Sequence, residues 1–430
     1  MDIHLNIMEK LYQSISIKNH PISSLPDNIK QEYLKGVGAV LKKFAIDKTY
    51  AQLLFEVWCI SILGKVVSYE YTEQCIKRAL VLHRVGLKFF RLKYEFFFDC
   101  FYLLAMSGCS TCNVMYNYLK NNIVGIFTEK ALNQVADFFI KDQQCNSIPK
   151  ELVEHRKQNI IYTNKPIKRI LVVANVSAGK STLINALTGY RVNMARNLAC
   201  TNALHFIYNK ANKDVVTYLD LHRKDYWYNE FVENVTSDIF LATAFHFKSD
   251  DLGKVCFIDT PGVNNAMDRK HQQITLNAIK ENNYEGLIFI SNGKNNATTD
   301  DATLMKYIVK HCKKPIIWTL NQLDGFKQQE DSIKKMLNDY RKDICKLGVK
   351  NPTLIPVSAK VALLMKQGDC LDEDDAYELD KYNKLFGKPY FDLPSYLNDH
   401  TIEQSTDLLD RTGIPLLEKT IMNNFNTTYL

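Results

Sequence analysis

The stretch 168–187, KRILVVANVSAGKSTLINAL, holds the residues whose types and spacing point most directly to chemistry. It contains A-x-x-x-x-G-K-S, a phosphate-binding loop in which alanine stands where the first glycine is usual. Such a loop turns successive backbone N–H groups toward a phosphate at the positive end of a helix. The stretch therefore predicts a nucleotide site. Its expected members are Ala174, Asn175, Val176, Ser177, Ala178, Gly179, Lys180, Ser181 and Thr182.

The spacing within this loop assigns a task to three residues. Gly179 lets the main chain approach the phosphate closely, Lys180 reaches the β- and γ-phosphates, and Ser181 offers a hydroxyl to Mg2+. The apolar run Ile170–Val173 predicts a buried strand before the loop, and the apolar spacing after it predicts a helix. A strand, a turn and a helix in this order make a chance match to the motif much less probable.

A second phosphate-facing element, Asp259-Thr-Pro-Gly262, directly follows the apolar strand Val255–Ile258. An aspartate at this place can hold Mg2+ through water, and the backbone N–H of Gly262 can reach the γ-phosphate. The tetrapeptide alone is a common turn, with proline and glycine as turn residues. Its position at the end of a buried strand favours the functional interpretation.

Two later segments indicate which base is bound. In Asn321-Gln322-Leu-Asp324 the Asp324 carboxylate can accept hydrogen bonds from guanine N1–H and its 2-amino group. Adenine would leave this carboxylate desolvated and unpaired, at a cost of about 1–3 kcal/mol or more. Gln322 stands where lysine is usual, and glutamine has a shorter alkyl stem to pack against the base. We therefore expect the affinity for the nucleotide to be modest. The tripeptide Ser358-Ala359-Lys360 matches the last guanine-contacting loop, in which the Ala359 N–H meets O6.

The loop between the phosphate-loop helix and the next strand supplies a further candidate. Thr201 is placed where a switch threonine binds Mg2+ through its hydroxyl and positions water through its carbonyl; the alternative is a threonine that begins a strand. Arg191 and Arg196 lie in the same loop as candidate arginine fingers, or as solvent-exposed side chains. We expect Mg2+ to be held by Ser181, Thr201 and Asp259.

The elements that position these motifs predict the fold class. Short buried strands alternate with helices from residue 168 onward, which is typical of a doubly wound α/β domain with a mostly parallel sheet and ligands at the carboxyl ends of its strands. Ala203–Asn209 and Val215–Leu219 are expected to extend the sheet through a hairpin. The expected strands are Arg169–Ala174, Lys254–Asp259, Gly286–Ser291, Pro315–Asn321 and Leu354–Val357, and the expected helices are Gly179–Thr188, Arg269–Glu281, Asp300–His311, Gln328–Leu347 and Ile414–Asn423.

Residues 1–158 predict helices only, and we expect an all-α domain there, followed by the P-loop domain over 159–430. Apolar residues recur at helical spacing, and Pro, Gly and Ser punctuate the connections. The aromatic density in 89–102 is most simply the core of a helical bundle. The expected helices are Ile29–Phe44, Tyr50–Val67, Thr72–Leu92, Lys93–Met106, Asn113–Ile126, Thr128–Lys141 and Lys150–Lys157.

Composition sets outer limits. The 430 residues have room for two or three domains, and a net charge of +7 allows anionic partners without requiring them. The eleven cysteines are scattered, no signal peptide is evident, and the most apolar windows contain acidic residues. We therefore expect a cytoplasmic protein, with a peripheral place at a membrane as the alternative.

The motifs together resemble the dynamin-like GTPases, particularly the bacterial ones, over roughly residues 165–430. The quoted matches are the phosphate loop 174–181, Cys200-Thr201, Asp259–Gly262, Thr298-Thr-Asp-Asp301 and Thr412–Glu418. The resemblance implies GTP and GDP as ligands with Mg2+, and a charge-compensating K+ or Na+ held with the help of Ser177. It also implies dimerisation across the nucleotide face. The residues expected to serve hydrolysis are Ser177, Lys180, Thr201 and Gly262.

Two departures from that family leave alternatives open. Val176 stands where dynamins place a polar residue that organises the attacking water, so turnover is expected to be slow or to use another group. No stalk follows the last helix, which leaves residues 1–158 as the candidate contact with a membrane or a protein partner. The alternatives are an Era-like GTPase associated with RNA, and a nucleotide-locked scaffold. No RNA-binding module follows the domain, so we do not expect a nucleic acid partner.

Overall fold

The computed structural model describes residues 20–84, 87–107, 112–192, 203–210, 217–219, 222–224, 239–248, 254–263, 269–294, 298–397 and 406–425. The chain divides into two compact units, Met1–Asn164 and Lys165–Leu430. The boundary expected after residue 158 lies inside helix α8 (Lys150–Thr163), which extends six residues beyond the expected end at Lys157.

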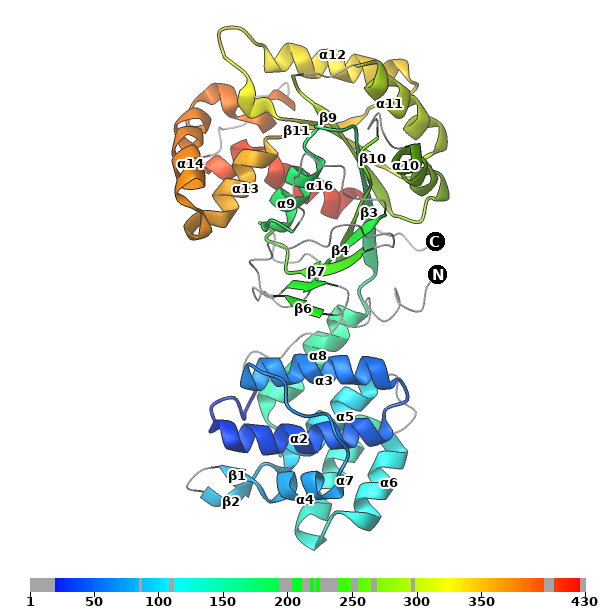
Figure 1. Ribbon diagram of the computed structural model, residues 1–430, viewed down its shortest axis with the longest axis vertical. Helices are drawn as coiled ribbons and strands as arrows, with labels where there is room; N and C mark the ends of the chain where they lie inside the picture. Colours follow the sequence, from blue (N-terminus) through cyan, green and yellow to red (C-terminus); the bar gives the residue numbers. More distant parts are fainter. Residues whose placement is uncertain are drawn as a thin grey trace. The chain divides into compact units, whose positions relative to one another are not determined.

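The first unit is built mainly from helices, as expected (Figure 1). Local sequence explains several of the helix ends: Asp47 and Thr72 accept hydrogen bonds from backbone N–H groups three residues on, and Gly64 ends a helix in the left-handed conformation. The helices are α2 (Asp27–Phe44), α3 (Lys48–Leu63), α4 (Glu73–Val81), α5 (Lys93–Met106), α6 (Cys112–Asn122), α7 (Ile126–Ile140) and α8.

The helix predicted over Thr72–Leu92 is wrong in its second half. Helix α4 ends at Val81, and a short antiparallel pair follows, β1 (His83–Arg84) with β2 (Leu87–Arg91). Aromatic residues and a glycine in this segment fit an extended ribbon better than a helix. The expectation of helices alone in this unit therefore failed at one place.

Helix α5 forms the centre of the first unit. All residues from Glu95 to Leu104 are buried, so the aromatic density noted in the sequence is core packing. The buried Asp99 carboxylate lies among His20 Nε2 at 3.1 Å, the Tyr33 hydroxyl at 2.8 Å and Trp58 Nε1 at 3.0 Å. A carboxyl group at the centre of a core is tolerated when such hydrogen-bonding partners surround it.

The second unit contains a nine-stranded sheet among its described residues, in the order β11-β10-β9-β3-β8-β4-β7-β5-β6 (Figure 1). The strands β11, β10, β9, β3 and β8 run parallel, as expected, so their carboxyl ends share one edge. The strand bounds are β3 Ile167–Ala174, β4 His205–Asn209, β5 Thr217–Leu219, β6 His222–Lys224, β7 Ile239–Thr243, β8 Lys254–Asp259, β9 Gly286–Asn292, β10 Ile316–Asn321 and β11 Thr353–Pro356.

The hairpin predicted between residues 203 and 219 is wrong in its pairing. Strand β4 pairs antiparallel with β8 and parallel with β7, whereas β5 pairs with β7 and β6. Strand β7, which lay outside the expected strands, therefore separates β4 from β5. Sequence neighbours form a hairpin only when no other strand competes for the same edge.

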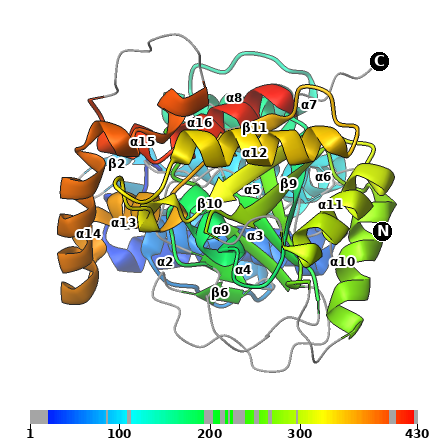
Figure 2. The same ribbon diagram turned by 90° about the horizontal axis from the view of Figure 1, so that it is seen from above.

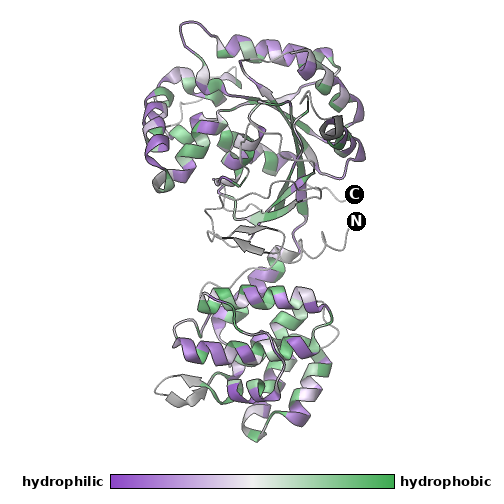
Figure 3. Ribbon diagram, viewed as in Figure 1, coloured by the Kyte–Doolittle hydropathy of each residue, from purple (hydrophilic) through white to green (hydrophobic). Residues whose placement is uncertain are grey.

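Helices cover both faces of the sheet. In Figures 1 and 2, α10 (Arg269–Glu281) and α11 (Thr299–His311) lie on one side of β9 and β10, and α13 (Ala359–Gln367) lies on the other. The core against α9 (Lys180–Thr188), α13 and α16 (Ile414–Asn424) takes alternate residues of the strands, and most of the central strands is hydrophobic (Figure 3). Polar residues occur near the strand ends, such as Lys168 and Arg169 in β3. The remaining α-helices are α12 (Ile333–Lys346), α14 (Glu373–Phe386) and α15 (Leu408–Arg411).

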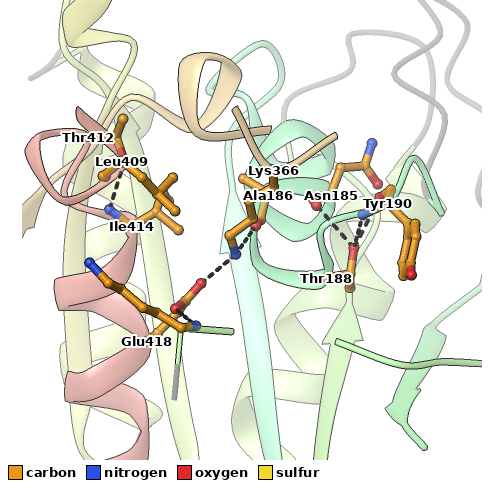
Figure 4. Close-up of polar contacts among 10 residues, drawn as sticks. Asn185, Ala186, Thr188, Tyr190, Lys366, Leu409, Thr412, Ile414 and Glu418 are labelled. Atoms are coloured by element: carbon orange, nitrogen blue, oxygen red, sulfur yellow. Dashed lines mark hydrogen bonds and ion pairs between the residues drawn. The ribbon is translucent and has the colours of Figure 1, made fainter. Parts of the chain in front are cut away.

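A buried ion pair joins three of these helices (Figure 4). The Lys366 ammonium of α13 contacts the Glu418 carboxylate of α16 and donates to the Ala186 carbonyl of α9 at 2.7 Å. Burial lowers the pKa of Lys366 and raises that of Glu418. The C-terminal helix is thereby attached to the helix that carries the phosphate loop.

Candidate nucleotide-binding site

The phosphate loop connects β3 to α9 at the common edge of the parallel strands. Its backbone is pinned to the loop after β8, because the N–H of Val176 donates to the Val263 carbonyl at 3.2 Å. Ser177 and Gly179 both adopt positive φ, 67° and 84°. The first amides of a helix have no acceptor within it, so this turn aims N–H groups outward at the edge of the sheet.

Gly179 is required here by space as well as by conformation. A Cβ at this residue would lie 2.5 Å from Asn321 Nδ2. The sequence predicted a glycine that allows close approach of a phosphate; the structure adds that it allows the close approach of β10. Ala174, in contrast, is the fully buried last residue of β3, so an alanine is accommodated without strain.

Lys180 and Asp259 lie together, as their motifs require. The Lys180 ammonium forms an ion pair with the Asp259 carboxylate, and both side chains are largely buried, with 11% and 5% exposed. Thr260 fixes the segment after Asp259 by donating to the Val172 carbonyl at 2.9 Å. Gly262 then passes close to Val176, because a Cβ there would lie 3.1 Å from the valine Cγ2.

Asn321 connects three of the predicted motifs with one side chain. Its amide nitrogen donates to the Ala178 carbonyl of the phosphate loop at 3.1 Å. Its amide oxygen accepts from the Ala359 N–H at 3.1 Å, at the start of α13. The asparagine is 1% exposed. The phosphate loop, the end of β10 and the loop after β11 are therefore held in one fixed arrangement.

Asp324 lies beside the last predicted loop. The Ser358 hydroxyl donates to its carboxylate at 2.5 Å. Gln322, in the left-handed conformation, donates from its side-chain amide to the Ser177 carbonyl at 2.9 Å. Lys360 on α13 pairs with Glu378 on α14. The structure thus brings the predicted base-binding residues to the same edge as the phosphate loop.

Asp301, in the first turn of α11, contacts the phosphate loop. Thr298 caps this helix by accepting from the Asp301 N–H at 3.1 Å, and the Asn175 amide donates to the Asp301 carboxylate. Burial raises the pKa of Asp301, which is 4% exposed. The sequence indicated this segment through family resemblance alone, with no role attached to it.

The structure describes only part of the predicted switch segment. Thr201 and Arg196 lie outside the described residues. Arg191, proposed as one of two candidate fingers, forms an ion pair with Asp375 and donates from Nε to Gln367 at 3.3 Å. In this arrangement its guanidinium joins the segment that follows α9 to α13 and α14.

The C-terminal segment also touches the site. The Ser358 N–H donates to the Thr412 carbonyl at 2.9 Å, and a Cβ on Gly413 would lie 2.0 Å from the Pro356 carbonyl oxygen. Glycine with φ 76° is therefore needed for the chain to pass β11. The sequence pattern at Thr412–Glu418 indicated the helix, and the structure shows that its start supports the loop of Ser358.

The oxygen atoms at this edge of the sheet fit a magnesium ion that the protein and a nucleotide would bind together. Among the described residues no group of three or more His, Cys, Asp or Glu side chains is arranged to hold a metal by itself. Ser181, the second residue of α9, and the buried Asp259 carboxylate supply oxygen atoms, which Mg2+ prefers together with phosphate oxygens and water.

Comparison with known proteins agrees with this geometry. Residues 170–323 match the model of the dynamin family, and the matched range contains the phosphate loop, Asp259–Gly262 and Asn321. The resemblance inferred from the sequence is confirmed over this range, which matches the GTPase domain of the dynamin family. None of the curated proteins searched matches the chain.

Solved structures of P-loop GTPases align with part of the chain. Era in complex with MgGDPNP and nucleotides of 16S ribosomal RNA is 18% identical, with a TM-score of 0.30; the alignment covers 50% of this chain and 57% of Era. The G domain of the T. maritima FeoB iron transporter is 15% identical, with a TM-score of 0.27 and coverage of 47% and 99%. The chain thus spans just over half the length of Era.

Proposed function

We propose that this protein is a Mg2+-dependent switch that binds and hydrolyses GTP. The observation that carries the proposal is the Asn321 side chain, which joins the phosphate loop at Ala178 to the base-binding loop at Ala359. A single side chain that spans these loops sets the distance between a phosphate site and a base site. Asp324, three residues further along the chain and bonded to the Ser358 hydroxyl, carries the carboxylate that would select guanine.

Each predicted residue has a task in this proposal. Residues 174–182 wrap the phosphates, with Lys180 as the charge on the β- and γ-phosphates. Ser181, Asp259 and Thr201 bind the metal, and Gly262 contacts the γ-phosphate through its N–H. Asn321, Gln322, Asp324, Ser358, Ala359 and Lys360 surround the base. Bound Mg2+ would neutralise phosphate charge, so the protein contributes positioning and electrostatics, with little covalent work.

The family resemblance adds a monovalent cation beside the phosphates, near Ser177, to this proposal. Its backbone is held at φ 67° and its carbonyl is fixed by the Gln322 amide. A K+ or Na+ ion there would compensate charge in the transition state, as the family resemblance implies. Dimerisation across the nucleotide face belongs to the same proposal, since it would cover the exposed part of the loop.

The helical unit is the proposed output of the switch. In GTPases, segments that become ordered when the nucleotide binds commonly recruit a partner or move a neighbouring element. Among the described residues, no helix has the length and apolar character needed to cross a bilayer. We therefore propose a cytoplasmic protein whose helical unit contacts a protein partner or, peripherally, a membrane, with no nucleic acid partner.

A nucleotide-locked scaffold is the second candidate, and one observation favours it. Val176 is 53% exposed beside the phosphate loop, at the position from which a polar side chain would organise water. An apolar side chain there offers no hydrogen bond to a nucleophile. Turnover measured at high protein concentration, in K+ and in Na+ buffers and with and without liposomes, separates a switch from a scaffold.

Nucleotide titration of the full chain tests the proposal. Lys180→Ala should abolish GTP binding, because the charge on the phosphates is lost. Asp324→Asn should move preference from GTP toward xanthosine triphosphate, because the new amide pairs with the 2-oxo group. Asp339→Asn, an exposed change on α12, is the matched control and should bind like wild type. An unchanged GTP preference in Asp324→Asn would refute the base assignment.

A further inference from the structure

Helix α14 (Glu373–Phe386) lies outside every sequence motif, and yet its side chains reach the proposed base site. The Glu378 carboxylate forms an ion pair with the Lys360 ammonium, which donates to it. The Tyr382 hydroxyl donates to the same Glu378 oxygen at 3.4 Å, and the Lys360 ammonium lies 5.9 Å from the centre of the Tyr382 ring. One carboxylate therefore holds a lysine and a tyrosine together.

This cluster borders Asp324. Burial raises the pKa of Tyr382, and the charges of Asp324 and Glu378 raise it further. Lys360 is two residues after Ser358, whose hydroxyl contacts Asp324. The cluster thus forms the edge of the site on the side where a base paired to Asp324 would lie.

The base needs apolar contact from this side of the site because Gln322 supplies less of it than the usual lysine would. A long lysine stem usually covers one face of the base at this position, but the Gln322 amide is engaged with the Ser177 carbonyl. Its shorter side chain is thereby committed to the phosphate loop. The other face of the base must supply more of the apolar contact, and the Lys360 stem and the Tyr382 ring of this cluster can provide it.

We propose that Glu378 is a positioning residue of the guanine site, which sets the Lys360 stem and the Tyr382 ring against the face of a base paired to Asp324. The inference rests on the proposed function, and it extends that function to a helix that no motif marks. Glu378 acts through Lys360 and Tyr382 and does not itself read the edge of the base.

Titration of the full chain with fluorescent GDP tests this inference. Glu378→Gln should weaken GDP binding about twofold to fivefold, the range for a half-exposed ion pair. Tyr382→Ala should weaken it about fivefold, and Tyr382→Phe, which keeps the ring, should weaken it less. The matched controls are Asp380→Asn, with the same charge change on α14, and Tyr377→Ala, which removes a tyrosine that is 66% exposed; both should bind like wild type.

Two further readouts separate contact with the base from general damage to the fold. Tripolyphosphate should displace the fluorescent GDP with an unchanged inhibition constant in every α14 variant, because the phosphate loop is intact. The ratio of GTP to xanthosine triphosphate affinity should also stay unchanged, because the variants alter the face of the base and not its edge.

The outcomes are distinct. If wild type binds GDP and both Glu378→Gln and Tyr382→Ala bind it equally well, the role of α14 is refuted while the proposed function stands. The same holds if these variants weaken tripolyphosphate as much as GDP. If wild type binds no guanine nucleotide, the proposed function itself fails.

Discussion

Two buried polar side chains, Asp99 in the first unit and Asn321 in the second, differ in the groups to which they are hydrogen-bonded. Asp99 is fully buried among side chains of its own helical core, from His20, Tyr33 and Trp58. Asn321 is as deeply buried, but its partners are the backbone groups of two loops at the edge of a sheet. The comparison teaches that equal burial can serve different ends. The first side chain fixes how helices pack, whereas the second fixes the loops of the proposed nucleotide site.

Removal of the Asp99 carboxylate should give the largest effect, on stability alone. Asp99→Ala leaves three buried donors without their acceptor, and we expect the free energy of unfolding to fall by about 3–5 kcal/mol. Denaturant unfolding, with hydrogen exchange to locate the change in residues 20–164, measures it. Asp27→Ala, which removes an exposed partner of Lys30, is the control and should cost far less. A comparable loss of nucleotide affinity in an Asp99→Ala protein that remains folded would contradict the comparison.

Removal of the Asn321 amide should affect nucleotide affinity, whereas removal of the Asp99 carboxylate should affect stability. Asn321→Ala leaves the Ala178 carbonyl and the Ala359 N–H without their partner, which costs about 1–3 kcal/mol and corresponds to a loss of GTP affinity of about tenfold to a hundredfold. Calorimetric titration measures the affinity. Asn277→Ala on α10, which removes an exposed bond to Gln273, should leave it unchanged. Unaltered affinity in Asn321→Ala would show that the loops are held by other contacts.

Acid should lower the free energy of unfolding of the helical unit, because the buried His155 side chain resists protonation in the folded state. Burial lowers the pKa of His155 to about 4, with the Tyr102 hydroxyl 3.1 Å from its Nε2. Because the folded pKa lies below the unfolded value of about 6.5, the stability is complete above pH 6.5 and is lost as pH falls toward 4. We expect a loss of about 2 kcal/mol between pH 7 and pH 5.

Denaturant unfolding at both pH values, for wild type and for His155→Gln, checks the contribution of this side chain. The variant should lose stability by about 2 kcal/mol less than wild type over the same pH interval. Hydrogen exchange should place the difference in the first unit. An identical pH dependence in the two proteins would mean that His155 stays accessible to protons in the folded state.

The smallest expected effect concerns the capping residue of α11. Thr298→Ala removes the acceptor of the Asp301 N–H and should lower stability by about 1 kcal/mol. Hydrogen exchange over 299–311 measures the local loss. Thr303→Ala, an exposed threonine within the same helix, serves as the control. Because Asp301 also contacts Asn175, a small decrease in nucleotide affinity should accompany the loss of the cap.

Much of the second unit could be predicted because its signals are local. The phosphate loop, the five parallel strands and the bounds of α10 follow from apolar runs interrupted by Gly, Pro and polar residues. The failures have non-local causes. Strand β7 enters between β4 and β5, and the segment after Val81 becomes a ribbon, since competition among strand edges and helix faces is not visible in a window of sequence.

The sequence by itself determined the order of the phosphate, metal and base motifs, because each consists of a few residues whose backbone or side chain has one evident chemical use. Only the tertiary structure decided which of them touch: that Asn321 joins two loops, that Arg191 pairs with Asp375, and that Glu378 on an unmarked helix meets Lys360. The physical reason is that contacts between distant segments depend on how strands pair and helices pack. Those arrangements are set by the whole core and not by the residues that meet.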